Sequence, residues 1–131
     1  MASAIRTAHI RPYVHRAAVF VVPLRMGSGT RLKVLEGLAM GKPMVSTALG
    51  CEGIDVTHGE HLLIADDADA FADAVLELMS NTPLSRRLSE QGRALMLRRY
   101  CWETVVQVLE GFYARLTAAA AKRHTSPRAV P

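Results

Sequence analysis

The sequence predicts an α/β fold, a small Rossmann-like parallel sheet with flanking helices. The run Val19–Pro23 is β-branched and aromatic, too short for a helix and apolar on both faces, which predicts a buried parallel strand. A second apolar run, Met44–Thr47, returns the chain to the sheet. Between them lie a glycine-bearing loop and a helical pattern that ends at Gly41 and Pro43, so the stretch forms one β-loop-α-β unit.

The remaining elements are predicted from the same local patterns. A short helix over Arg11–Ala17 opens around Pro12, and a third strand is expected at Leu62–Ala65. The helix of the β-loop-α-β unit, Arg31–Met40, carries an apolar face at helical spacing. That face consists of Leu32, Leu35, Leu38 and Ala39. Three further helices are predicted at Ala68–Met79, Thr82–Arg99 and Trp102–Ala119.

Capping residues and apolar stripes support two of these helices. Asp66 and Asp67 are predicted to cap the helix at Ala68, and Thr82 with Pro83 to open the next one. The inward-facing positions are predicted to be Phe71, Val75, Leu78 and Met79 on the first helix, and Leu84, Leu88, Leu95 and Met96 on the second.

Size and composition limit the chain to one globular domain, because it has 131 residues of which 50% are apolar. Three predicted strands are fewer than a doubly wound sheet normally has, so we expect a partial domain whose uncovered sheet edge allows self-association. The net charge of +4 is modest and aromatic residues make up only 5%, so no nucleic-acid partner is expected.

The cysteines and histidines do not predict a metal site. Cys51 and Cys101 lie far apart without metal-like spacing, which indicates free thiols in a reducing compartment. His58 and His61 flank a turn at Gly59, and neither belongs to an H-E-x-x-H motif. No apolar run approaches the length of about 20 residues that a membrane span needs.

The loop Gly27-Ser28-Gly29-Thr30 is the candidate binding site. It lies at the carboxyl end of the first strand and before a helix, where free N–H groups and the helix dipole favour an anion. The glycines permit positive φ and a close approach of the ligand, and Ser28 and Thr30 add hydroxyl donors. Positive charge comes from Arg25, Arg31 and Lys33. Phosphate is therefore the predicted ligand.

Glu36 extends this prediction from a phosphate to a nucleotide. A carboxylate one turn past Lys33 would repel phosphate unless it accepts hydrogen bonds from neutral hydroxyls, such as those of a ribose. Two alternatives stay open, because many α/β proteins carry glycines here and bind nothing, and Glu36 would also suit a simple pair with Lys33. The loop matches neither a Walker-type motif nor the dinucleotide pattern G-x-G-x-x-G.

Four segments together resemble a known family. They read PLRMGSGTRLKVLEGLAMGKPMVST, ALGCEGIDV, HGEHLLIADDADAFADAV and RRYCWETVV. They are similar to the carboxy-terminal domain of GT-B-fold glycosyltransferases of the group 1 (family 4) type, from about Ile10 to about Leu116. In that family this domain binds the nucleotide-sugar donor. Many members carry an E-x(7)-E signature whose second glutamate, matched by Glu36, hydrogen-bonds the ribose. The first glutamate would fall at Ser28.

The resemblance implies a domain organisation. Residues 1–9 would be a non-matching extension, residues 10–121 part of the nucleotide-sugar-binding domain, and residues 122–131 a disordered tail. The chain would then be the truncated C-terminal half of a GT-B enzyme. The acceptor would bind a first domain that this chain lacks, so the chain alone is expected to be inactive.

The function implied is donor binding in a retaining glycosyltransferase of polysaccharide biosynthesis. The full enzyme would transfer sugar from a UDP- or GDP-sugar to a saccharide or lipid-linked acceptor, in the cytoplasm or peripherally at the inner membrane face. The implied donor-binding residues are Gly27, Ser28, Gly29, Thr30, Lys33 and Glu36. No catalytic residue is indicated. Neither metal nor cofactor is expected, because cationic groups and the helix dipole suit the departing diphosphate.

Three other functions stay open at the level of sequence. The chain would also fit a non-catalytic nucleotide-binding or interaction remnant of the same fold. Another GT-B enzyme, such as a nucleotide-sugar epimerase or a phosphorylase-like enzyme, would share these motifs. A flavodoxin-like domain would share only the general α/β pattern.

Overall fold

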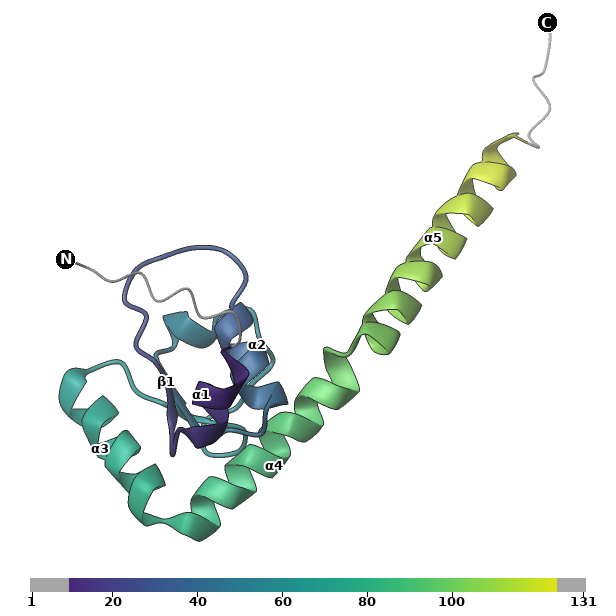
Figure 1. Cartoon of the computed structure of the whole chain (residues 1–131). Helices are drawn as coiled ribbons and strands as arrows, with labels where there is room; N and C mark the ends of the chain where they lie inside the picture. The colour runs from purple at the N-terminus through teal and green to yellow at the C-terminus, as the bar shows by residue number, and fades with distance from the viewer. Residues whose placement is uncertain (1–9, 125–131) are drawn as a thin grey trace, which may run out of the picture. The chain divides into compact units, whose positions relative to one another are not determined.

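The computed structural model describes residues 10–124, and the chain divides into two compact units, residues 1–97 and 98–131 (Figure 1). The first unit holds the sheet and most of the helices. The predicted extension at residues 1–9 lies outside the described residues, as do residues 125–131 of the predicted tail.

The sheet consists of three parallel strands, β1 (Phe20–Val22), β2 (Met44–Ser46) and β3 (Leu63–Ile64), in the order β1-β2-β3. All residues of the central strand β2 are buried. The predicted Rossmann-like parallel sheet is confirmed, although each strand is shorter than its apolar run. The expectation that the first strand is buried on both faces is wrong. Val21 is 46% exposed, because β1 is an edge strand of the described sheet.

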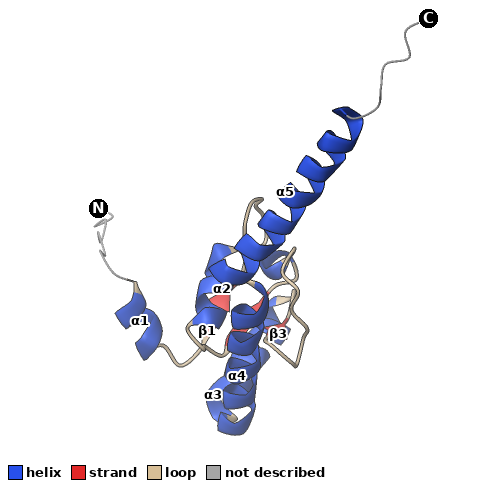
Figure 2. Ribbon diagram, turned by 90° about the vertical axis from the view of Figure 1, so that its right-hand side faces the viewer, coloured by secondary structure: helices blue, strands red, loops and turns tan. Residues whose placement is uncertain are grey.

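The helices of the first unit cover both faces of this sheet, and Figure 2 shows the short strands enclosed among them. The helices of the first unit are α1 (Arg11–Arg16), α2 (Leu32–Ala39), the 3-10 helix η1 (Leu49–Cys51), α3 (Ala68–Ser80) and α4 (Thr82–Arg99). Val45 and Leu63 form one buried cluster with Leu78 of α3 and Leu88 of α4. Phe20 and Met44, which pair in register, meet α2 on the opposite face.

The apolar face of α2 differs from the predicted one. Its buried residues are Val34, Gly37 and Leu38, whereas Leu32 is 59% exposed. The cause is a close approach of helix and sheet, because a Cβ built on Gly37 would lie 3.1 Å from the Phe20 ring. The lack of a side chain at this position lets α2 turn its Gly37 side toward the sheet.

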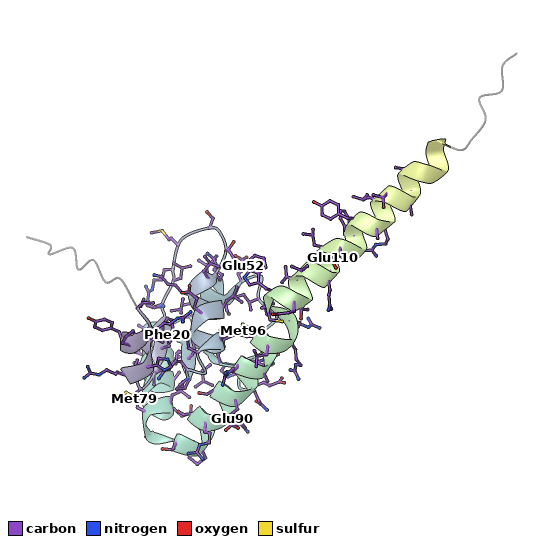
Figure 3. All side chains as sticks on the ribbon, turned by 45° about the vertical axis from the view of Figure 1, so that its right-hand side comes forward. Phe20, Glu52, Met79, Glu90, Met96 and Glu110 are labelled. Carbon is purple, nitrogen blue, oxygen red and sulfur yellow. The ribbon has the colours of Figure 1, made fainter. Side chains whose placement is uncertain are left out.

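On α3 and α4, most of the predicted inward positions are confirmed. Leu78, Leu88, Leu95 and Met96 are buried, and the predicted partners Phe71, Val75 and Leu84 pack against the buried cluster. Met79 is the exception, because it is 61% exposed on α3 (Figure 3). It lies one residue past Leu78, so the helix turns it away from the cluster.

Of the two residues predicted to cap α3, only Asp67 does so, and the cap of α4 lies one residue before the predicted one. Asp67 caps α3 through a 2.9 Å hydrogen bond from the Ala70 amide, while Asp66 accepts from the Ala48 amide at 2.8 Å. Asn81 replaces Thr82 as the cap of α4, since its side chain accepts from the Leu84 amide at 3.1 Å. Asp66 therefore ties the end of β3 to the segment after β2 instead of capping a helix.

The second unit is formed around a single long helix, α5 (Trp102–His124). The helix passes the predicted end at Ala119 and includes residues 122–124 of the segment predicted to be disordered. The alanine run before Lys122 explains the extension, because alanine has the highest helix propensity. At its first turn, the Thr104 hydroxyl donates to the Arg98 carbonyl at 3.3 Å.

Candidate functional site

The candidate site lies where β1 ends and the chain runs through the glycine loop, residues 27–30, into α2. Gly27 has a φ of 139° and Gly29 a φ of 98°, values that other residues rarely adopt. All four loop residues are exposed. Both glycines therefore adopt the positive φ that the sequence predicts for them.

The end of the loop and the first turn of α2 present amide groups that are not used inside the protein. The Leu32 amide donates to the Thr30 carbonyl at 2.9 Å, and the Val34 amide to the Arg31 carbonyl at 3.0 Å. None of the described residues accepts a hydrogen bond from the amides of Gly29, Thr30 or Lys33. No side chain caps this helix either. The amides are thus available to an external anion.

Arg31 is occupied within the protein. Its side chain is only 8% exposed, and Nη2 donates to the Gly27 carbonyl at 3.4 Å and to Glu52 Oε2 at 3.3 Å. Its buried Nε finds no acceptor among residues 10–124. Arg31 therefore holds the loop in shape and pairs with a carboxylate, instead of presenting a free charge at the surface.

Two adjacent hollows border this region. The first, of about 400 Å³, lies beside the loop and is lined by Thr30, Arg31 and Lys33 together with the end of β1. The second, of about 380 Å³, is lined by Lys33 and Glu36 together with residues of α1 and β1. Lys33 and Val21 line both. Lys33 thus lies between the hollow beside the loop and the hollow beside Glu36.

The predicted site residues are brought together in part. The loop residues and Lys33 lie at one end of α2, as expected, and Glu36 is exposed one turn further along. No ion pair joins Lys33 and Glu36 in the part of the chain that the structure describes, so the simple pairing considered from sequence is not present. The predicted site residues therefore line two neighbouring hollows, and neither hollow holds them all.

Glu52 is the site residue whose role the sequence did not predict. It follows η1 and meets Arg31 across 21 positions of sequence. Two signals in the sequence pointed to this position. The turn after the second strand falls, in a parallel sheet, at the same edge as the glycine loop, and Glu52 with Gly53 resembles a segment near the donor site of the family described above. Neither signal indicates that the carboxylate pairs with Arg31.

The histidines flanking Gly59 serve the turn between η1 and β3. His61 Nδ1 accepts from the Thr57 amide at 3.0 Å, and His58 Nδ1 accepts from the Ile64 amide at 2.9 Å. Among the described residues there is no group of three or more side chains that could hold a metal ion. None of the helices within residues 10–124 is long and apolar enough to cross a membrane.

The cysteines are both free thiols. Cys51 is the last residue of η1 and is buried, and this burial raises the pKa of its thiol above the ordinary value. Cys101 is half-buried at the start of the second unit, where its sulfur lies 3.1 Å from the Thr104 hydroxyl.

Comparison with curated proteins identifies several relatives. The chain is 31% identical over 108 residues to a phosphatidyl-myo-inositol mannosyltransferase of Mycobacterium leprae, which covers 81% of this chain and 29% of that protein. It is 30% identical over 102 residues to a lipopolysaccharide core biosynthesis mannosyltransferase of Rhizobium meliloti, covering 75% and 29%. An uncharacterized glycosyltransferase of Methanocaldococcus jannaschii is 27% identical over 110 residues, covering 82% and 31%. The chain therefore spans less than a third of the length of these relatives.

A solved structure and a family model agree with these relatives. Sucrose-phosphate synthase from Thermosynechococcus elongatus superposes with a TM-score of 0.72 at 28% identity, over 84% of this chain and 28% of that one. The predicted GT-B-type fold is thereby confirmed. The family model described as "Glycosyl transferases group 1" matches residues 3–81, more than half of the chain. The chain thus belongs to the group 1 glycosyltransferases.

Proposed function

We propose that the chain binds the nucleotide-sugar donor of a retaining glycosyltransferase, with the pyrophosphate at residues 27–30 and the ribose against Glu36. The donor is a UDP- or GDP-sugar, and the full enzyme transfers its sugar to a saccharide or lipid-linked acceptor. The observation that carries the proposal is the set of unpartnered amides at Gly29 and Thr30 in the loop and at Lys33 in the first turn of α2.

The start of α2 suits a pyrophosphate for electrostatic reasons. The amides at a helix amino terminus carry partial positive charge, and the aligned peptide dipoles add to it. Lys33 contributes a full charge to the same hollow. These groups would stabilise the departing diphosphate of the donor without requiring a metal ion.

The second hollow supports a ligand longer than pyrophosphate. Lys33 lines both hollows, so a nucleotide whose phosphates lie beside the loop would reach Glu36 by passing Lys33. The Glu36 carboxylate is exposed there and accepts hydrogen bonds only, which suits the two hydroxyls of a ribose. This arrangement gives the pyrophosphate and the ribose one hollow each.

The names of the relatives support the same chemistry. Two of them are mannosyltransferases, and the solved structure is a sucrose-phosphate synthase. All three names describe proteins that form or transfer sugar units, and the residues that the family model matches, 3–81, include the loop and α2.

Calorimetric titration of the chain with UDP, GDP and inorganic pyrophosphate tests the proposal. One of the two nucleotides should bind, and Glu36→Ala should weaken that nucleotide by about 1–3 kcal/mol while leaving pyrophosphate unaffected, because only the ribose contact is lost. Glu77→Ala, which removes an exposed acid from α3, is the matched control. The proposal fails if neither nucleotide binds. Unchanged nucleotide affinity in Glu36→Ala would remove Glu36 from the site.

A further inference from the structure

Glu52 places a second carboxylate beside the glycine loop. Figure 3 labels it at the same end of the first unit as that loop. Its Oε2 accepts a hydrogen bond from Arg31 Nη2 at 3.3 Å, and the same nitrogen donates to the Gly27 carbonyl at 3.4 Å. One guanidinium nitrogen thus joins the carboxylate to the first residue of the loop.

The pairing with Arg31 makes this carboxylate compatible with a bound anion. A free carboxylate would repel the pyrophosphate, but the charge of Glu52 is balanced by a guanidinium within ion-pairing distance. Arg31 is itself buried to all but 8% of its side chain, so it stays in place and holds Glu52 in turn.

Glu52 retains the capacity to bind a ligand. Its side chain is 69% exposed, and only Oε2 is engaged with Arg31. A carboxylate offers about four lone-pair sites, so most of them are free to accept hydrogen bonds. Hydroxyl groups are the natural donors, because another cation would compete with Arg31 and an anion would be repelled.

We propose that Glu52 recognises the sugar of the donor, by accepting hydrogen bonds from hydroxyl groups of the hexose that the pyrophosphate carries. The inference rests on the proposed function, because the hexose lies beside Glu52 only if the pyrophosphate binds at residues 27–30. Arg31 acts as a positioning residue, since it fixes Glu52 and the Gly27 carbonyl through one nitrogen. Glu36 and Glu52 then divide the ligand, the first holding the ribose and the second the sugar.

The test compares each nucleotide with its sugar-bearing form by calorimetry, using the pairs UDP and UDP-glucose, and GDP and GDP-mannose. The wild-type chain should bind one sugar nucleotide more tightly than the corresponding nucleotide. Glu52→Gln should abolish this gain, a loss of about tenfold in affinity for the sugar nucleotide, because each hydrogen bond to the charged carboxylate is weakened. Its affinity for the nucleotide alone should stay within about twofold of wild type.

Two further variants keep the test decisive. Glu52→Asp retains the charge that balances Arg31, so it guards against misfolding, and its shorter side chain should reduce the same gain. Glu90→Gln, an exposed acid on α4, is the matched control and should bind like wild type (Figure 3).

The outcomes separate this inference from the proposed function. Equal weakening of nucleotide and sugar nucleotide in Glu52→Gln would show that Glu52 only holds the loop, and would overturn the inference alone. Unchanged affinities in that variant, or no gain from the sugar in wild type, would also overturn it. Failure of the wild-type chain to bind any nucleotide would overturn the proposed function, and the inference with it.

Discussion

Substitution of Gly29 by alanine separates the shape of the loop from its chemistry. Gly29 has a φ of 98°, and a Cβ at this position would meet no described atom within 4 Å. The cost is therefore confined to the backbone, about 1–2 kcal/mol for an L-residue in the left-handed region. The loop is exposed, so we expect it to escape this strain by changing its conformation. That change would turn the amides of Gly29 and Thr30 away from the bound pyrophosphate.

The expected loss of affinity follows from the hydrogen bonds involved. Each bond from an amide to a charged phosphate contributes about 1.5–3 kcal/mol, so losing one should weaken nucleotide binding by about tenfold to hundredfold. Calorimetric titration with the nucleotide that binds wild type measures this directly. The folded state should lose less than the full backbone strain, a shift of a few degrees in the melting temperature.

Gly59→Ala is the matched control for this substitution. Gly59 has a φ of 75° and, like Gly29, no described atom within 4 Å of an added Cβ, but it lies in the turn before β3. It should cost a similar amount of stability and leave nucleotide affinity unchanged. If Gly29→Ala binds nucleotide as well as Gly59→Ala does, the loop amides do not hold the pyrophosphate.

Three further predictions concern packing and the burial of Cys51. Gly92→Ala should destabilise the first unit by about 1–3 kcal/mol in urea unfolding, because its Cβ would lie 2.7 Å from Leu38 Cδ2 and 3.1 Å from a backbone oxygen. Gly111→Ala is the control, because a Cβ at Gly111 would meet no described atom within 4 Å, and it should increase the helicity of α5. A Gly92→Ala variant more stable than wild type would contradict the close packing at Gly92. Because burial raises the pKa of Cys51, iodoacetamide at pH 8 should label Cys101 first, as mass spectrometry would show. The stability that the neutral Cys51 thiol contributes should be present below the ordinary thiol pKa of about 8.5 and lost as the pH rises through the raised pKa of the folded state. Equal labelling of the two cysteines would contradict the difference in burial.

Element positions were predictable from sequence because they depend on local patterns. The apolar runs and helical stripes placed the strands, and every predicted helix is present, with boundaries close to those expected. The caps were less predictable, since Asp66 and Asp67 are equally good by local chemistry. The hydrogen bond from the Ala48 amide to Asp66, across 18 positions, leaves Asp67 to cap α3.

The buried face of α2 depended on packing that the sequence does not encode locally. The pattern of leucines predicted a face including Leu32, but the helix rotates so that Gly37 meets Phe20 and Met44. The missing side chain of Gly37 lets the helix backbone pack directly against the Phe20 and Met44 side chains. A periodicity of apolar residues contains no information about which small residue permits that approach.

For the candidate site, the sequence by itself determined the loop, its glycines and the charges nearby. Glycine permits the positive φ that Gly27 and Gly29 adopt, and the loop's place before a helix follows from the order of elements. Only the tertiary structure decided that Glu52 meets Arg31 and that Glu36 faces a separate hollow. The physical reason is that parallel pairing brings together chain segments distant in sequence, and the rotation of a helix on its sheet sets the direction of each side chain.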